Sequence, residues 1–386
     1  MKIIKSIIRV FFIVLILANT VIWITGNTHL YKGLSDTYFQ GRLKPSVDNP
    51  GLFYSRVLEA GVTYPWEISK SFGSSELSEE IKKTNSEFGT LAYLVIHKDS
   101  IVHEDYYEHY SKNTLSNSFS MAKTILSIIT GAAVREGKVD INASVHSYIP
   151  EFITLKDSAL KVKHLLTMTS GMNFRESYGN PFGFMAKAYY GTNLRELTSG
   201  YKLEKTPGTE YSYLGGNNLL LSFLLEKVTG QKVSDYGSDK IWSKLGMEND
   251  GKWILDHEDG DEKTFSGVYA TARDYAKLGE LYINKGNAYG EQLVDSDYVA
   301  RSISPINVKD SREMNTDYYG YSWWLTKYEG YDVFYLRGIL GQYVFCVPDK
   351  DLIIVRLGRL RDPNKKDGVN HDDIWVYLKE GFHIIE

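Results

Sequence analysis

Strand-like segments lie at both ends of this 386-residue chain, and helical patterns fill the part between them. Two runs, 91–97 and 101–107, read as a hairpin with its turn at 98–100. Four more strands are expected in the last third, at 321–326, 333–336, 342–347 and 352–357. This order predicts an α/β (α+β) fold: an antiparallel sheet built from both ends of the chain and flanked by helices, with an inserted helical subdomain at about 120–265.

The helical patterns are apolar residues that recur at every third or fourth position. The strongest begins near Ser120 and stops at Gly137. Further helices are expected at 162–167, 217–228, 234–245, 272–284 and 373–382. Residues 27–88 lack strong periodicity, so we interpret them as a linker and an extension that packs on the main domain, 89–386.

The N-terminus carries the pattern of an export signal. Lys2, Lys5 and Arg9 precede an apolar stretch at 10–24, which is shorter than the roughly 20 residues that a spanning helix needs. We therefore expect residues 1–26 to anchor the chain in a membrane, with the body exported to the periplasm or the outside. A cleaved signal with a secreted body is the alternative.

Composition excludes several function classes. The net charge is −4 and no long basic run follows the N-terminus, so no nucleic-acid partner is expected. The single cysteine, Cys346, excludes an internal disulfide and a Cys-rich metal site. His103 and His109 lack the spacing of a zinc helix, and the acidic run 256–262 lacks that of a calcium loop, so we expect a solvated loop there. No metal or cofactor is predicted, and no oligomeric state follows from the sequence.

Ser120 and Lys123 form the pattern Ser-x-x-Lys at the start of the strongest helix. A serine hydroxyl needs a base to become a nucleophile, and a lysine three residues on lies on the same helix face. The pattern also occurs at Ser158 and at Ser199, but neither precedes a long apolar helix. Ser120 is therefore the candidate nucleophile.

Five segments in order resemble the class C β-lactamase-like serine hydrolases, within the β-lactamase and penicillin-binding protein superfamily. They are Ser-Phe-Ser-Met-Ala-Lys at 118–123, His-Leu-Leu-Thr-Met-Thr-Ser-Gly at 164–171, and the segments 207–213, 270–277 and 337–342. Within that superfamily the chain is most similar to the branch of nylon-oligomer (6-aminohexanoate-dimer) hydrolases and esterases. The resemblance implies a β-lactamase/transpeptidase-like fold.

The resemblance also implies roles for particular residues. Ser120 would be acylated, with Lys123 as its proton acceptor and Tyr213 as a general base and acid. The backbone N–H groups of Ser120 and Ile339 would form the oxyanion hole, and Gly338 would let the strand approach the substrate.

Two departures from the family pattern bear on the substrate. The segment 213–215 reads Tyr-Leu-Gly where the family has Tyr-x-Asn. The segment 336–338 reads Leu-Arg-Gly where the family has a lysine or histidine, a hydroxyl residue and glycine, so the family's cation is absent or displaced by one residue to Arg337. Both argue against true β-lactamase activity. Arg337 either binds a substrate carboxylate or pairs with an acidic side chain. Of Trp323 and Trp324, one faces the core, and Trp324 is the candidate for the pocket wall.

The sequence thus predicts a serine hydrolase that cleaves a small amide, peptide or ester. Two alternatives remain open. One is a cell-wall peptidase or carboxypeptidase specific for D-amino acids, and the other is a sensor or binding protein that is acylated without turnover.

Overall fold

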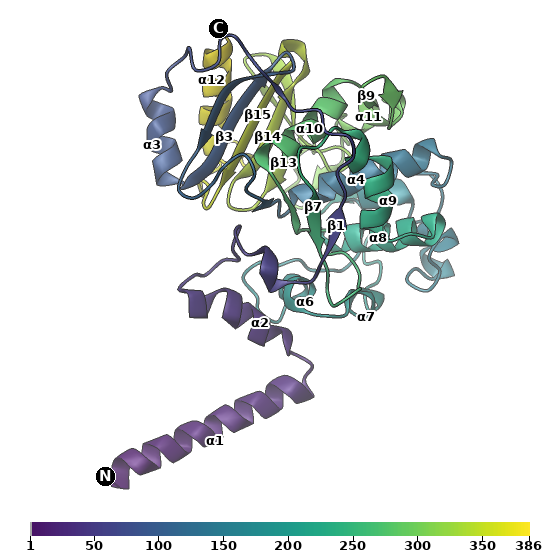
Figure 1. The fold of residues 1–386 in the computed structure, drawn as a ribbon. Coiled ribbons are helices and arrows are strands. Elements are labelled where there is room, and N and C mark those ends of the chain that lie inside the picture. Colours follow the sequence, from purple (N-terminus) through teal and green to yellow (C-terminus); the bar gives the residue numbers. More distant parts are fainter. Residues whose placement is uncertain (1) are drawn as a thin grey trace.

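The computed structural model describes residues 2–386. Its main element is a seven-stranded sheet with the order β12-β13-β14-β15-β3-β4-β2, antiparallel except that β2 runs parallel to β4. The strands are β12 (Trp324–Tyr328), β13 (Tyr331–Gly338), β14 (Gln342–Val347), β15 (Leu352–Gly358), β3 (Thr90–His97), β4 (Ser100–Tyr106) and β2 (Glu67–Ile68). Because β15 pairs with β3, the two ends of the chain meet at the centre of the sheet (Figure 1). The predicted fold class is confirmed.

Helices cover both faces of this sheet because its strands alternate apolar side chains between two cores. On β3, Leu94 and Ile96 belong to one core, and Tyr93 and Val95 belong to the other. The first core is covered by α10 (Ala272–Ile283) and α4 (Met121–Arg135), and the second by α12 (Asp373–Ile385), which packs beside α3 (Glu79–Glu87).

The remaining helices lie mainly beside the sheet (Figure 1). They are α1 (Lys2–Ile24), α2 (His29–Asp36), α5 (Val162–Leu166), α6 (Phe184–Tyr190), α7 (Leu194–Ser199), α8 (Gly216–Thr229), α9 (Val233–Lys240) and α11 (Ser296–Ser302). The smaller strands are β1 (Ser55–Leu58), β5 (Ser116–Asn117), β6 (Glu210–Tyr211), β7 (Gly251–Ile254), β8 (Val268–Ala270), β9 (Asn287–Ala288), β10 (Glu291–Gln292) and β11 (Lys309–Asp310). A second sheet has the order β1-β7-β8-β5, so the segment 27–88 contributes strands to two sheets.

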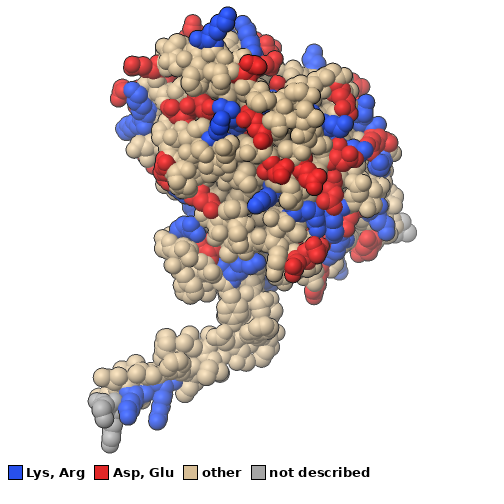
Figure 2. Space-filling view, in the orientation of Figure 1, with Lys and Arg blue, Asp and Glu red and all other residues tan. Residues whose placement is uncertain are grey.

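The helix α1 projects away from the body, and its apolar side chains are exposed (Figure 1). Among residues 2–386 it is the one helix that is long and apolar enough to cross a membrane. Figure 2 shows basic side chains only toward its N-terminal end.

One predicted strand boundary is wrong. The strand expected at 321–326 begins at Trp324, because a tight turn precedes it. Gly320 N–H donates to Trp323 O at 2.9 Å, and Ser322 has a left-handed φ of 63° that a strand does not allow.

Candidate active site

The segment before Ser120 is fixed by strand pairing. Ser118 N–H donates to Val268 O at 2.7 Å, and Ser118 Oγ accepts from Val268 N–H at 3.1 Å. The next residue, Phe119, has a left-handed φ of 44° and donates its N–H to Asn117 Oδ1 at 2.8 Å. This strained turn ends at Ser120, the residue at the N-terminus of α4.

Lys123 lies one helical turn beyond Ser120 and is buried. Its Nζ donates to Ser120 Oγ at 3.2 Å and to Phe265 O at 2.8 Å. The same Nζ is 4.8 Å from the centroid of the Tyr213 ring. The structure thus brings together the three residues that the sequence selected as catalytic.

The other two Ser-x-x-Lys patterns form no such pair. Ser158 is exposed in a turn, and Lys161 caps the next helix, α5. Ser199 is the last residue of α7, so Lys202 lies beyond the helix. Neither pattern opens a buried helix.

Tyr213 stands half-buried just before α8. Its ring centroid is 5.6 Å from that of Trp324. Within residues 2–386 its hydroxyl forms no hydrogen bond, so it is the ring of Tyr213 that contacts Lys123.

The end of β13 approaches the start of α4. A Cβ atom at Gly338 would lie 2.3 Å from Ser118 O, so only glycine fits this crossing. The crossing brings Ile339, the next residue, to the edge of the catalytic centre. The backbone hydrogen bonds of the described chain include none donated by the N–H of Ser120 or of Ile339.

Arg337 and Trp324 stack at the same edge. The guanidinium carbon of Arg337 is 3.2 Å from the Trp324 ring centroid, and Nη1 donates to Val369 O at 3.2 Å. Among residues 2–386 Arg337 forms no ion pair with a carboxylate, and its contacts there include the Trp324 ring and the Val369 carbonyl. Trp323, in the turn before β12, is fully buried in the other core, and Trp324 faces Tyr213.

Glu176 is a residue of this centre that the sequence interpretation missed. It lies on the loop 173–183, accepts the Gly215 N–H through Oε2 and receives the Tyr178 hydroxyl at 2.6 Å on Oε1. A Cβ at Gly215 would lie 3.3 Å from Glu176 Oε2, so the carboxylate occupies space beside the position of the family's asparagine. Burial raises the pKa of Glu176, and the Lys123 charge opposes that rise. The glycine at 215 is the sequence signal that could have pointed to it.

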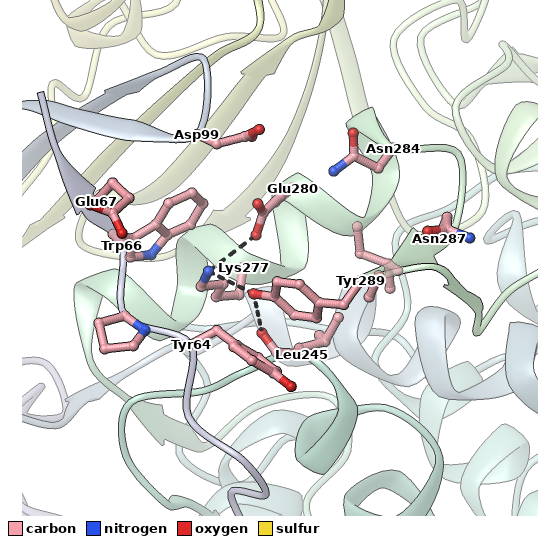
Figure 3. A pocket seen from close by; sticks show the side chains of 13 residues that line it. Tyr64, Trp66, Glu67, Asp99, Leu245, Lys277, Glu280, Asn284, Asn287 and Tyr289 are labelled. Atoms are coloured by element: carbon pink, nitrogen blue, oxygen red, sulfur yellow. Dashed lines mark hydrogen bonds and ion pairs between the residues drawn. The ribbon is translucent and has the colours of Figure 1, made fainter.

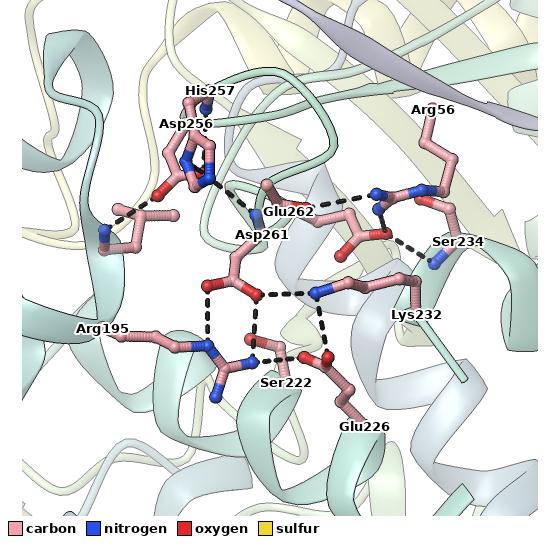
Figure 4. Close-up of polar contacts among 12 residues, drawn as sticks. Arg56, Arg195, Ser222, Glu226, Lys232, Ser234, Asp256, His257, Asp261 and Glu262 are labelled. Carbon is pink, nitrogen blue, oxygen red and sulfur yellow. Dashed lines mark hydrogen bonds and ion pairs between the residues drawn. The ribbon is translucent and has the colours of Figure 1, made fainter. Parts of the chain in front are cut away.

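The two ends of the acidic run 256–262 are buried and paired, at Asp256, Asp261 and Glu262, whereas residues 257–259 are exposed. The prediction of a solvated loop is therefore wrong for the ends of the run and holds for its middle. Asp261 accepts from Arg195 Nε at 2.8 Å and from Lys232 Nζ at 3.1 Å (Figure 4). Both cations also pair with a glutamate on α8. Buried carboxylates need such cationic partners. These ion pairs hold the loop 256–262 against three helices.

A residue just after this loop carries a hydrogen-bond acceptor for Lys123. Glu262 pairs with Arg56 at 2.5 Å and accepts the Ser234 N–H at 3.0 Å (Figure 4). Three residues further on is Phe265, whose carbonyl accepts from Lys123. The ion pairs therefore hold the carbonyl that positions Lys123.

A separate cavity of about 280 Å³ lies at the C-terminal half of α10 (Figure 3). Lys277 extends along its wall, 3.8 Å from the Trp66 ring centroid, and pairs with Glu280 at 3.4 Å and with the Tyr289 hydroxyl at 2.9 Å. None of the residues predicted for catalysis lines this cavity.

An antiparallel sheet flanked by helices, with a Ser-x-x-Lys pair opening a buried helix beside it, defines the class of serine hydrolases with the β-lactamase and penicillin-binding protein fold. Residues 79–379 match the Beta-lactamase family, and the chain belongs to that family. The resemblance stated from the sequence is confirmed, and the chain is a hydrolase of this family.

Similar proteins support this assignment. The 6-aminohexanoate-dimer hydrolase of Paenarthrobacter ureafaciens is 26% identical over 74% of this chain and 77% of its own length. A solved Bacillus anthracis structure named "Putative 6-aminohexanoate-dimer hydrolase" has a TM-score of 0.73 at 20% identity, covering 86% of this chain and 90% of its own. A family VIII carboxylesterase has a TM-score of 0.60 at 18% identity, covering 80% of this chain and 99% of its own.

Proposed function

We propose that this chain is an exported, membrane-anchored amidase or esterase that works through an acyl-enzyme on Ser120. The observation that carries the proposal is the hydrogen bond of 3.2 Å between Lys123 Nζ and Ser120 Oγ at the N-terminus of a buried helix. Lys123 is buried and Ser120 half-buried, and a hydrogen-bonded base is what a serine needs for attack.

The reaction follows from this geometry. Ser120 Oγ attacks the substrate carbonyl while its proton passes to Lys123, and the N–H groups of Ser120 and Ile339 receive the oxyanion. The bond to the leaving amine or alcohol breaks as that group takes a proton delivered through Lys123 and Tyr213. Water then attacks the acyl-enzyme, which releases the acid and restores the serine.

The substrate class comes from the similar proteins and from the departures in the site. One relative is named for the hydrolysis of a 6-aminohexanoate dimer, and a protein of similar fold is named a carboxylesterase. Gly215 replaces the family's asparagine with the Glu176 carboxylate beside it, and the cation Arg337 is displaced by one residue from the family's position, so small amides and esters fit the proposal better than β-lactams.

The test uses the full chain in detergent with a nitrophenyl acetate substrate. Ser120→Ala should lower the turnover by about 10³-fold or more, as removal of a nucleophile does. Ser158→Ala is the matched control from a second Ser-x-x-Lys pattern and should keep full turnover. Wild-type mass spectra should show an acetyl adduct that maps to Ser120. Equal turnover in Ser120→Ala and wild type would refute the proposal.

The anchor is tested separately. After a carbonate wash, the mature protein should stay in the membrane fraction, and its intact mass should include the apolar helix α1. A soluble protein that has lost α1 would show that the segment is a cleaved signal, and would leave the catalytic proposal standing.

A further inference from the structure

The end of α1 nearest the body has the chemistry of a membrane boundary. Asn19 and Thr20 interrupt the apolar helix, and their side chains donate to Leu15 O and Ile16 O at 2.9 Å, so their polar groups are satisfied within the helix. Trp23, 69% exposed, lies one turn further on, where aromatic side chains mark the interface. The basic residues at the other end predict that the body lies outside the cytoplasm.

Large apolar side chains are also exposed just after α2, the short helix that follows α1. Tyr38 is 64% exposed, Phe39 78% and Leu43 81%, and Lys44 beside them is also exposed. Soluble surfaces rarely group so many large apolar side chains, whereas a lipid headgroup layer accommodates aromatic residues next to a cation.

The loop 173–183 is attached to this boundary at one end. The ring nitrogen Nε2 of the buried His29, the first residue of α2, is 2.8 Å from Pro181 O. The helix α6, which follows the loop, packs on α2, and Tyr190 on α6 donates its hydroxyl to Asp36 at 3.1 Å. Phe182, next to Pro181, is 57% exposed beside the start of the body.

The same loop enters the catalytic centre at its other end. Glu176 accepts the N–H of Gly215, and the Lys123 charge acts on its carboxylate. Pro181 is five positions after Glu176 in the sequence, which is at most about 18 Å of extended chain. The wall of the catalytic centre and the membrane boundary are thus two ends of one short segment.

We propose that the loop 173–183 docks on the bilayer through Phe182, and that the enzyme takes an amphipathic acyl ester or amide from that membrane. The occupant of this surface is the lipid bilayer that the proposed anchor α1 would span, since exposed large apolar residues recur from α1 through Tyr31 and Leu34 on α2 to Leu43. This inference rests on the proposed function, because it assigns the substrate class of the same Ser120 centre.

Docking is tested without catalysis. The full chain with Phe182→Cys, carrying an environment-sensitive fluorophore, is placed in phospholipid vesicles that contain nitroxide-labelled lipid. The one natural cysteine, Cys346, is fully buried and stays unlabelled. Tyr289→Cys is the matched control, 52% exposed and next to β9, far from α1 in Figure 1. We expect the Phe182 label to lose more than half of its fluorescence and the Tyr289 label to keep its own. Equal quenching at both positions overturns the proposal.

The substrate class is tested by a ratio of two rates. The full chain in vesicles hydrolyses a long-chain nitrophenyl ester held in the bilayer and nitrophenyl acetate in the water. Phe182→Asp should lower the ratio of the first rate to the second by about fivefold or more, and Tyr289→Asp should leave it unchanged. If Phe182→Asp leaves the ratio of the two rates unchanged, the inference of a membrane substrate is wrong. Turnover of nitrophenyl acetate by the wild type would still support the proposed function in that case. Failure of the wild type to turn over acetate contradicts the proposed function itself, and the quenching result then still decides the docking.

Discussion

Arg356 holds the turn that carries Ile339, and its replacement by methionine gives the sharpest test of how the site is built. Its guanidinium is fully buried and donates to four backbone carbonyls. The acceptors are Leu340 O at 3.1 Å and Gly341 O, Leu360 O and Phe88 O at 2.8 Å each. The first two belong to the β13–β14 turn directly after Ile339.

The magnitude follows from these bonds. A hydrogen bond contributes about 1 kcal/mol net to stability, so losing four carbonyl bonds costs about 4 kcal/mol. Methionine has similar length and no charge to bury, so the loss comes from the carbonyls that are left without a donor. The freed turn should also misplace Ile339 N–H. A lost oxyanion donor costs about 10²-fold in kcat, and a displaced one should cost about tenfold.

Urea unfolding and steady-state ester hydrolysis measure the two effects. Arg359→Met is the matched control, because Arg359 forms half-exposed ion pairs with Asp48 and Glu108. Such pairs contribute about 1 kcal/mol or less, and kcat should not change. If Arg356→Met lost less than about 1 kcal/mol, or if its folded fraction kept the wild-type kcat, the argument would be refuted.

Three further predictions follow. Glu176→Gln keeps a hydrogen-bond acceptor but removes a negative charge near Lys123, so the acid limb of the pH–rate profile should move to lower pH; an unmoved limb would show that Glu176 only shapes the loop. Gly338→Ala forces a Cβ to within 2.3 Å of Ser118 O, and should lower kcat by about tenfold or more while the protein still folds, as circular dichroism would check. Burial lowers the pKa of Lys263 to about 7. Between about pH 7 and 10 the unfolded chain therefore binds this proton and the folded one does not, so the free energy of unfolding rises with pH. Lys263→Met should abolish that rise in urea titrations at pH 7 and 9, and a slope equal to that of wild type would contradict it.

Local patterns were enough to predict one part of the catalytic centre. Ser120 and Lys123 are three residues apart on a helix, so spacing alone places them on one face. Glu176 could not be found in this way, because its partner Gly215 lies on another segment and only the fold brings the two together. The family pattern supplied the remaining residues, Tyr213 and Ile339, and their roles stay predictions.

Periodicity predicted the long helices and strands, because it too depends only on residues that are close together in the sequence. The helix at 272–284 and the late strands bury a regular face, so their sequences alternate with the right period. Segment 27–88 contributes short or edge elements with little buried surface, and no period marks them. A charged residue such as Asp261 indicates an exposed position when only the sequence is known, because its ion-pair partners are brought to it by the fold.

The pairing of β15 with β3 sets the order in which this protein can acquire its structure. Val95 and Ile354 are partners at the centre of the sheet, although about 260 residues of chain separate them. A ribosome must therefore release nearly the whole chain before the central strands can meet. During synthesis the early hairpin β3–β4 has no central partner until β15 has been made. Loss of the last three dozen residues would remove β15 and leave that hairpin without its central partner, so the fold depends on the C-terminal end of the chain.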